Sequence, residues 1–116
     1  DLHMDEELNP AACGLATTAA LVKDMEFAGH VVCGHNCALS AQDESLALKT
    51  LDAVAQTSIT LITLPMTNLL LQDAVTGRTP RQRGITLLKE AHAAFLCSWP
   101  ATTCKTRFAT WAATTH

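Results

Sequence analysis

The stretch Val31-Val32-Cys33-Gly34-His35-Asn36 decides the fold class, because it is an apolar run whose last residues turn polar. Two other stretches have the same form: Asp1-Leu2-His3-Met4-Asp5-Glu6 and Ile62-Thr63-Leu64-Pro65-Met66-Thr67-Asn68. Each has the pattern of a buried strand, and each is followed by a helix-like segment. The sequence therefore predicts an α/β fold of consecutive βα units with parallel strands, with its chemistry at the carboxyl ends of the strands.

The segments between these strands carry helix signals. Asn9-Pro10 places a capping residue before a first-turn proline, so we expect a helix to begin there and to continue to Gly29. Apolar residues at helical spacing predict two more helices, over residues 43–56 and 86–94. Residues 58–64 are expected to form the third strand, which Pro65 closes, and a longer connection follows. Strand starts about 30 residues apart match the length of a βαβ unit with a right-handed crossover.

Composition excludes several classes of function. The 116 residues suffice for one domain, but a complete (β/α)₈ barrel needs roughly 250 residues, so we expect only part of a barrel. Hydrophobic residues make up 48% of the chain and charged residues 16%, as in globular proteins. The formal net charge of −3 argues against nucleic acid or an anionic membrane as a partner.

The cysteines are odd in number and include no CxxC pair. They are Cys13, Cys33, Cys37, Cys97 and Cys104. This usage predicts reduced thiols and a cytoplasmic location. Cys33, His35 and Cys37 would share one side of an extended strand, so a small zinc site is an alternative, although it lacks a fourth ligand.

Taken singly, the polar residues at the strand ends have ordinary explanations. A lone histidine at a strand end is more often a hydrogen-bonded surface residue than a metal ligand. The acidic run Asp5-Glu6-Glu7 suits a solvated loop ahead of a helix N-terminus. What favours a catalytic interpretation is the order of these residues along a βα repeat.

Four groups of residues, taken in order, resemble the second half of a cytosine deaminase-like, metal-dependent amidohydrolase. They are His3-Met4-Asp5-Glu6, Gly34-His35, Leu64-Pro65-Met66-Thr67-Asn68 with Leu71-Gln72, and Arg81-Gln82-Arg83-Gly84-Ile85-Thr86. The resemblance implies that residues 1–94 form strands five to seven of a (β/α)₈ TIM barrel, together with their helices.

The resemblance also implies a reaction, the hydrolytic deamination of a cyclic amidine such as cytosine with release of ammonia. In this family one divalent metal ion, Fe²⁺ or Zn²⁺, activates water. By resemblance, His3 is the metal ligand and Glu6 is the catalytic carboxylate that moves the proton. His35 would hydrogen-bond the activated water or the developing oxyanion, and Asn68 and Gln72 would bind the substrate.

Residues 95–116 form an atypical tail. Both tryptophans lie there, acidic residues are absent, threonine is dense, and no helix or strand period persists. The strand-eight motif of the family, Ser-Asp-Asn-x-x-Asp-Pro-Phe, is missing. A shifted reading of the codons for residues 99–108 can encode Ala-Ser-Asp-Asn-Val-Gln-Asp-Pro-Phe, so we expect the tail to be out of frame.

These departures lead us to expect a piece of a longer enzyme. The family's first-strand His-x-His pair is also absent, and of four expected metal-site residues only His3 remains. One imidazole does not hold a catalytic metal ion, so we expect the isolated chain to be inactive and not to retain the metal. The expected partner is a small nucleobase-like substrate. The alternative is a small non-catalytic α/β binding or oligomerisation module, whose strand edges would favour a homo-oligomer.

Overall fold

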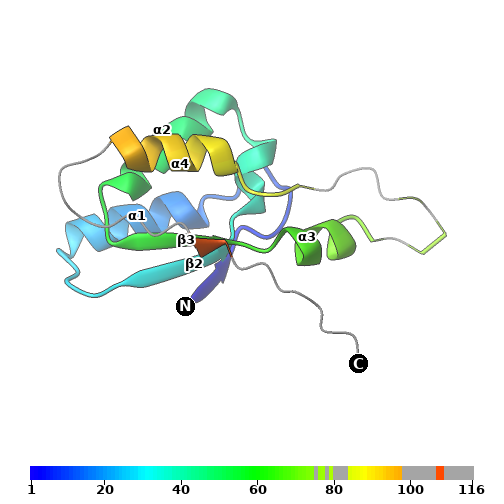
Figure 1. Cartoon of the computed structure of the whole chain (residues 1–116), viewed down its shortest axis with the longest axis horizontal. Coiled ribbons are helices and arrows are strands. Elements are labelled where there is room, and N and C mark those ends of the chain that lie inside the picture. The colour runs from blue at the N-terminus through cyan, green and yellow to red at the C-terminus, as the bar shows by residue number, and fades with distance from the viewer. Residues whose placement is uncertain (75, 78, 80–83, 98–106, 109–116) are drawn as a thin grey trace.

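Strands and helices alternate along the chain in the computed structural model (Figure 1). It describes residues 1–74, 76–77, 79, 84–97 and 107–108. The elements are β1 (Leu2–Met4), α1 (Gly14–Asp24), β2 (Val31–His35), the 3-10 helix η1 (Cys37–Ala41), α2 (Glu44–Ala55), β3 (Ile59–Thr63), α3 (Pro65–Leu71), α4 (Leu88–Cys97) and β4 (Arg107–Phe108).

The strands form one parallel sheet in the order β1-β2-β3-β4. His3 pairs with Gly34 across β1 and β2, and Cys33 pairs with Leu61 across β2 and β3. Because neighbouring strands run the same way, their carboxyl ends meet at one edge of the sheet. The predicted α/β class, with parallel strands alternating with helices, is confirmed.

Three helices form a layer that shares one apolar core with the sheet. Helices α1 and α4 both pack against α2, whereas α3 lies apart, beyond the carboxyl end of β3 (Figure 1). The buried core residues are Leu15, Ala19, Cys33, Leu39, Ala47, Leu51, Val54, Ile59, Leu61 and Ala91. Alternate residues of β3 and residues at helical spacing in α2 contribute to this core, as each period requires. None of the helices among the described residues has the length and apolar character needed to cross a bilayer.

Helix α1 begins at Gly14, four residues later than Asn9-Pro10 predicted. The Asn9 side chain accepts a hydrogen bond from the Ala11 N–H at 3.0 Å, which makes a turn and not a helix start. The helix is capped from a distance instead: the Asp5 carboxylate accepts from the N–H groups of Gly14 at 3.1 Å and Leu15 at 2.8 Å. The local prediction was wrong because the decisive cap comes from another loop.

The ends of β1 and β2 are joined by backbone hydrogen bonds through left-handed residues. Asp5, His35 and Asn36 have φ angles of 50°, 73° and 52°, which non-glycine residues adopt rarely and at an energetic cost. These turns let the Asn36 N–H donate to the Met4 carbonyl at 3.1 Å and the Ala38 N–H donate to the Asp5 carbonyl at 3.0 Å. The strained backbone therefore lies at the edge of the sheet where the polar residues gather.

Two other helices differ from the expectation. Pro65 does not only close β3: it is the first residue of α3, a position that proline favours because it needs no N–H donor there. The helix expected over 86–94 runs from Leu88 to Cys97, past the start of the expected tail. Beyond Cys97, only Arg107–Phe108 of the tail is described, as β4 beside β3. The other tail residues lie outside the described part of the chain, so the division at residue 94 and the out-of-frame interpretation stay predictions.

Replacing Asp5 with alanine should destabilise the fold, because two N–H groups at the start of α1 lose their acceptor. We expect the free energy of unfolding in urea to fall by about 1–2 kcal/mol. Glu7→Ala is the matched control: Glu7 is an exposed acid in the same loop, and its loss should change stability by less than about 0.5 kcal/mol. Equal losses in the two variants would contradict the capping role.

Stability should also fall in alkali. Cys33 is fully buried, and burial raises the pKa of its thiol to about 11. The folded state therefore holds this proton more tightly than the unfolded chain. The contribution of this thiol to the free energy of unfolding is complete below its ordinary pKa of 9.0 and is lost as the pH rises toward about 11. The chain has no tyrosine to obscure this titration.

Urea unfolding measured at several pH values tests this expectation. The free energy of unfolding of the parent chain should stay level near neutrality and decline above about pH 9, by at most about 1.4 kcal/mol per pH unit for one group. Cys33→Ala should lower stability at all pH values but decline less steeply. An equally steep decline in Cys33→Ala would assign the effect to other groups.

Candidate functional site

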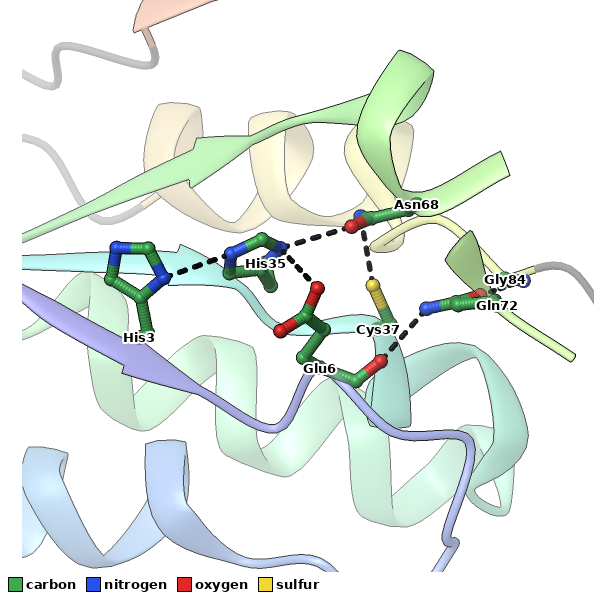
Figure 2. A network of polar contacts seen from close by, with 7 residues as sticks. All are labelled: His3, Glu6, His35, Cys37, Asn68, Gln72 and Gly84. Carbon is green, nitrogen blue, oxygen red and sulfur yellow. Dashed lines mark hydrogen bonds and ion pairs between the residues drawn. The ribbon is translucent and has the colours of Figure 1, made fainter. Parts of the chain in front are cut away.

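All five residues predicted for the site lie in one polar network at the carboxyl edge of the sheet (Figure 2). His3 comes from β1, His35 ends β2, and Glu6 lies in the loop after β1. Asn68 lies in α3, and Gln72 follows that helix. Residues 66 positions apart in the chain (Glu6 and Gln72) are thereby brought into contact. Parallel pairing is the reason, since it places successive strand ends side by side.

The two histidines contact each other directly. His3 Nδ1 lies 3.1 Å from His35 Nε2, and the ring centroids are 5.0 Å apart with the planes tilted by 51°. His3 is exposed and His35 is buried. The Nε2 atom of the buried His35 is therefore in contact with an exposed ring in this structure.

The other ring nitrogen of His35 faces two oxygen atoms. Its Nδ1 lies 2.9 Å from Asn68 Oδ1 and 3.5 Å from Glu6 Oε1. The Glu6 side chain is 46% exposed, so its carboxylate reaches both the buried histidine and the solvent. A carboxylate so placed can exchange protons with a bound molecule while one side of it stays held by the protein.

A buried cysteine completes the network. Asn68 is fully buried, and its Nδ2 donates to Cys37 Sγ at 2.9 Å. Burial raises the pKa of the Cys37 thiol, so the sulfur stays protonated near neutral pH. The sequence marked Cys37 only as one member of the zinc alternative. Its contact with Asn68 could not be read from the sequence, because it joins η1 to α3.

Gln72 ties two loops together through both ends of its amide. Its Nε2 donates to the Glu6 carbonyl at 2.8 Å, and its Oε1 accepts from the Gly84 N–H at 2.5 Å. Gly84 is tightly packed: a Cβ there would lie 2.3 Å from Leu8 Cδ2 and 2.7 Å from Ser40 Oγ. The polar side-chain atoms of Asn68 and Gln72 form hydrogen bonds within the protein in this structure. Their predicted contact with substrate stays a prediction.

An acidic hollow opens beside the network. Its volume is about 430 Å³, and Asp5, Glu6, Glu7 and Gln72 line it. Of the lining residues that the structure describes, three are acidic, and their carboxylates favour cations and groups that donate hydrogen bonds. An amino-substituted ring has donors of this kind.

The described residues do not complete a metal centre. Among them, no three histidine, cysteine or acidic side chains converge on a point where they could hold one ion. Cys33 packs among the apolar side chains of the core. The zinc alternative built on Cys33, His35 and Cys37 is therefore wrong for this structure. Of the predicted catalytic metal site, His3 is the candidate ligand in this part of the chain.

Comparison with known proteins identifies what the fold and the network resemble. No family model matches the chain. The chain is 48% identical over 94 residues to a pterin deaminase of Rhizobium rhizogenes (strain K84 / ATCC BAA-868), which is 81% of this chain and 22% of that protein. The crystal structure of the 5-methylcytosine deaminase from Klebsiella pneumoniae liganded with 5-fluorocytosine matches with a TM-score of 0.68. The identity is 25%, over 79% of this chain and 22% of that one.

The chain is related to the pterin and 5-methylcytosine deaminases of the amidohydrolase family. It spans about a fifth of the length of these relatives, 22% in both comparisons. The predicted family and the partial match to a TIM-barrel amidohydrolase are confirmed. This relationship to deaminases does not identify the substrate or the metal.

Changing Gln72 to glutamate should loosen the loops of this deaminase-like site. The new carboxylate can still accept from Gly84, but it has no proton to donate to the Glu6 carbonyl. We expect the free energy of unfolding near pH 7 to fall by about 1–3 kcal/mol, the cost of an unpaired buried polar group. Gln56→Glu, at an exposed position after α2, is the control. A Gln72→Glu chain as stable as this control would show that the amide does not hold the loops.

Proposed function

We propose that this chain contributes the Glu6–His35–His3 part of an active site that deaminates a cyclic amidine by hydrolysis. The observation that carries the proposal is the contact of these three side chains at the carboxyl edge of a deaminase-related sheet. A half-exposed carboxylate beside a buried histidine, at the wall of a hollow, is an arrangement suited to moving protons.

The reaction requires two proton movements. The oxygen of water bonds to the ring carbon that carries the exocyclic amine, and the bond from that carbon to the amine then breaks. One proton of the water goes to the ring nitrogen, and the other, from the hydroxyl now on the ring carbon, goes to the amine, which leaves as ammonia. We assign this proton transfer to Glu6, whose carboxylate reaches both the hollow and His35.

His35 has two roles in this proposal. Its Nδ1 side holds the Glu6 carboxylate in place at 3.5 Å. Its Nε2, bonded to His3 in this structure, is the atom that would accept a hydrogen bond from the attacking water once His3 is otherwise engaged. The predicted divalent metal, Fe²⁺ or Zn²⁺, remains a proposal with His3 as its ligand. The residues that the structure describes do not complete its site.

An amino-substituted heterocycle is the proposed substrate class. The relatives are named for pterin and 5-methylcytosine, and one of them is liganded with 5-fluorocytosine. Each of these molecules has an amino group on a ring carbon next to a ring nitrogen. We place pterin first among the candidates, because the pterin deaminase is the more similar relative, and cytosine second. A cytoplasmic location and a homo-oligomer are further proposals, the first from the reduced cysteines and the second from the open strand edges.

A chimera tests this function. The segment of the Rhizobium pterin deaminase that matches this chain is replaced by the corresponding residues of this chain, and ammonia release is measured with pterin, cytosine and 5-methylcytosine. We expect the chimera to release ammonia from at least one of them. Glu6→Gln should lower kcat by about 10²-fold or more, because an amide cannot carry the proton. We expect the chain alone to release none.

Glu44→Gln is the matched control for the chimera, because Glu44 is an exposed acid at the start of α2. It should leave kcat within about twofold of the parent chimera. A folded chimera in which Glu6→Gln retains full activity would refute the role of Glu6. A folded chimera that releases no ammonia from any of the three compounds would refute the proposed substrate class.

A further inference from the structure

Four side chains form one continuous chain of hydrogen bonds from the interior to the surface (Figure 2). It runs from Cys37 through Asn68 and His35 to His3, and the first three of these residues are buried. Each amide or neutral ring in such a series of hydrogen bonds must donate at one end and accept at the other. The direction in which these hydrogen bonds are donated therefore determines which nitrogen of each histidine carries the hydrogen.

The direction is set at His35 Nδ1. Its two neighbours there are Asn68 Oδ1 at 2.9 Å and Glu6 Oε1 at 3.5 Å. Ionised carboxylate and amide oxygens only accept hydrogen bonds, so this nitrogen must carry the hydrogen. In a neutral ring the other nitrogen, Nε2, then has a lone pair.

The tautomer of His35 in turn determines the tautomer of His3. Because His35 Nε2 accepts, His3 must donate from its Nδ1 across the 3.1 Å contact. Its own Nε2 is then left with a lone pair. A neutral imidazole with a free lone pair is the form that binds a metal ion or accepts a proton.

Asn68 supports this direction because its amide oxygen is the nearer acceptor for the N–H of His35. A half-turn of the amide would point its NH₂ group at the N–H of His35 and its oxygen at the sulfur. Cys37 Sγ accepts from Nδ2 at 2.9 Å in the observed orientation. Both residues are fully buried, so water does not compensate for a lost partner.

We propose that Asn68 is a positioning residue whose amide oxygen sets the tautomers of His35 and His3, while its amide nitrogen bonds to the buried Cys37. Both neutral rings carry their hydrogen on Nδ1, and the exposed His3 presents a lone pair on Nε2. The use of that lone pair in deamination rests on the proposed function, whereas the tautomers themselves do not.

Long-range ¹H–¹⁵N correlation spectra of the histidine rings test the proposal on the chain itself. The chain has five histidines, so His30, His92 and His116 are changed to glutamine to leave two rings. At about pH 8.5 unperturbed rings are neutral, and both rings should show the Nδ1–H pattern. An Nε2–H pattern at His35 in the parent chain would overturn the proposal.

Three variants separate positioning by Asn68 from the effect of the nearby acid. Asn68→Leu should abolish the single tautomer at His35 and give a mixture. Asn68→Asp retains an acceptor and should restore Nδ1–H. Glu6→Gln should leave the tautomer unchanged, because Asn68 is the nearer partner. A tautomer that changes in Glu6→Gln but not in Asn68→Leu would overturn the assignment.

If Asn68→Leu does not fold, the parent spectrum together with Asn68→Asp and Glu6→Gln still decides the question. Activity of the chimera is a separate readout. If the chain shows the expected tautomers but the chimera releases no ammonia, only the proposed function is refuted. If His35 carries its hydrogen on Nε2 but the chimera is active, only the tautomer inference is refuted.

Discussion

The parallel pairing of β1 with β2 is the constraint on which the site depends. It places the ends of both strands at one edge, and the bonds from Asn36 to Met4 and from Ala38 to Asp5 hold them together. The left-handed backbone at these ends is energetically unfavourable and is retained where the polar network begins. Strain in the turns and alignment of the side chains are thus consequences of the same strand pairing.

Buried and half-buried polar groups join the segments around the site. Asp5 starts α1 from a distance, and Gln72 joins the loop after β1 to the segment at Gly84. Asn68 links His35 to Cys37 within the interior. Such groups are expensive to leave unpaired, so each one specifies a single arrangement of the segments that it joins. This loop geometry gives Glu6 its position between the interior and the hollow.

The relationship to deaminases gives this network its chemical meaning. A contact between two histidines and a carboxylate occurs in many proteins as a structural feature. Here it lies at the carboxyl edge of a sheet related to two heterocycle deaminases, where catalytic residues of barrel enzymes gather. The described residues supply proton-handling groups and one candidate metal ligand but no complete metal centre.

The sequence alone determined the α/β class and the shared location of His3, Glu6 and His35, because both follow from strand ends that recur at βαβ spacing. It did not determine the start of α1, the helix at Pro65 or the partners of Asn68 and Gln72. Those features depend on contacts between residues far apart in the chain, such as Asp5 with Gly14 and Gln72 with Glu6. Periodicity and local capping rules report only on neighbours along the chain, whereas hydrogen bonds between loops form only once the sheet has brought the loops together.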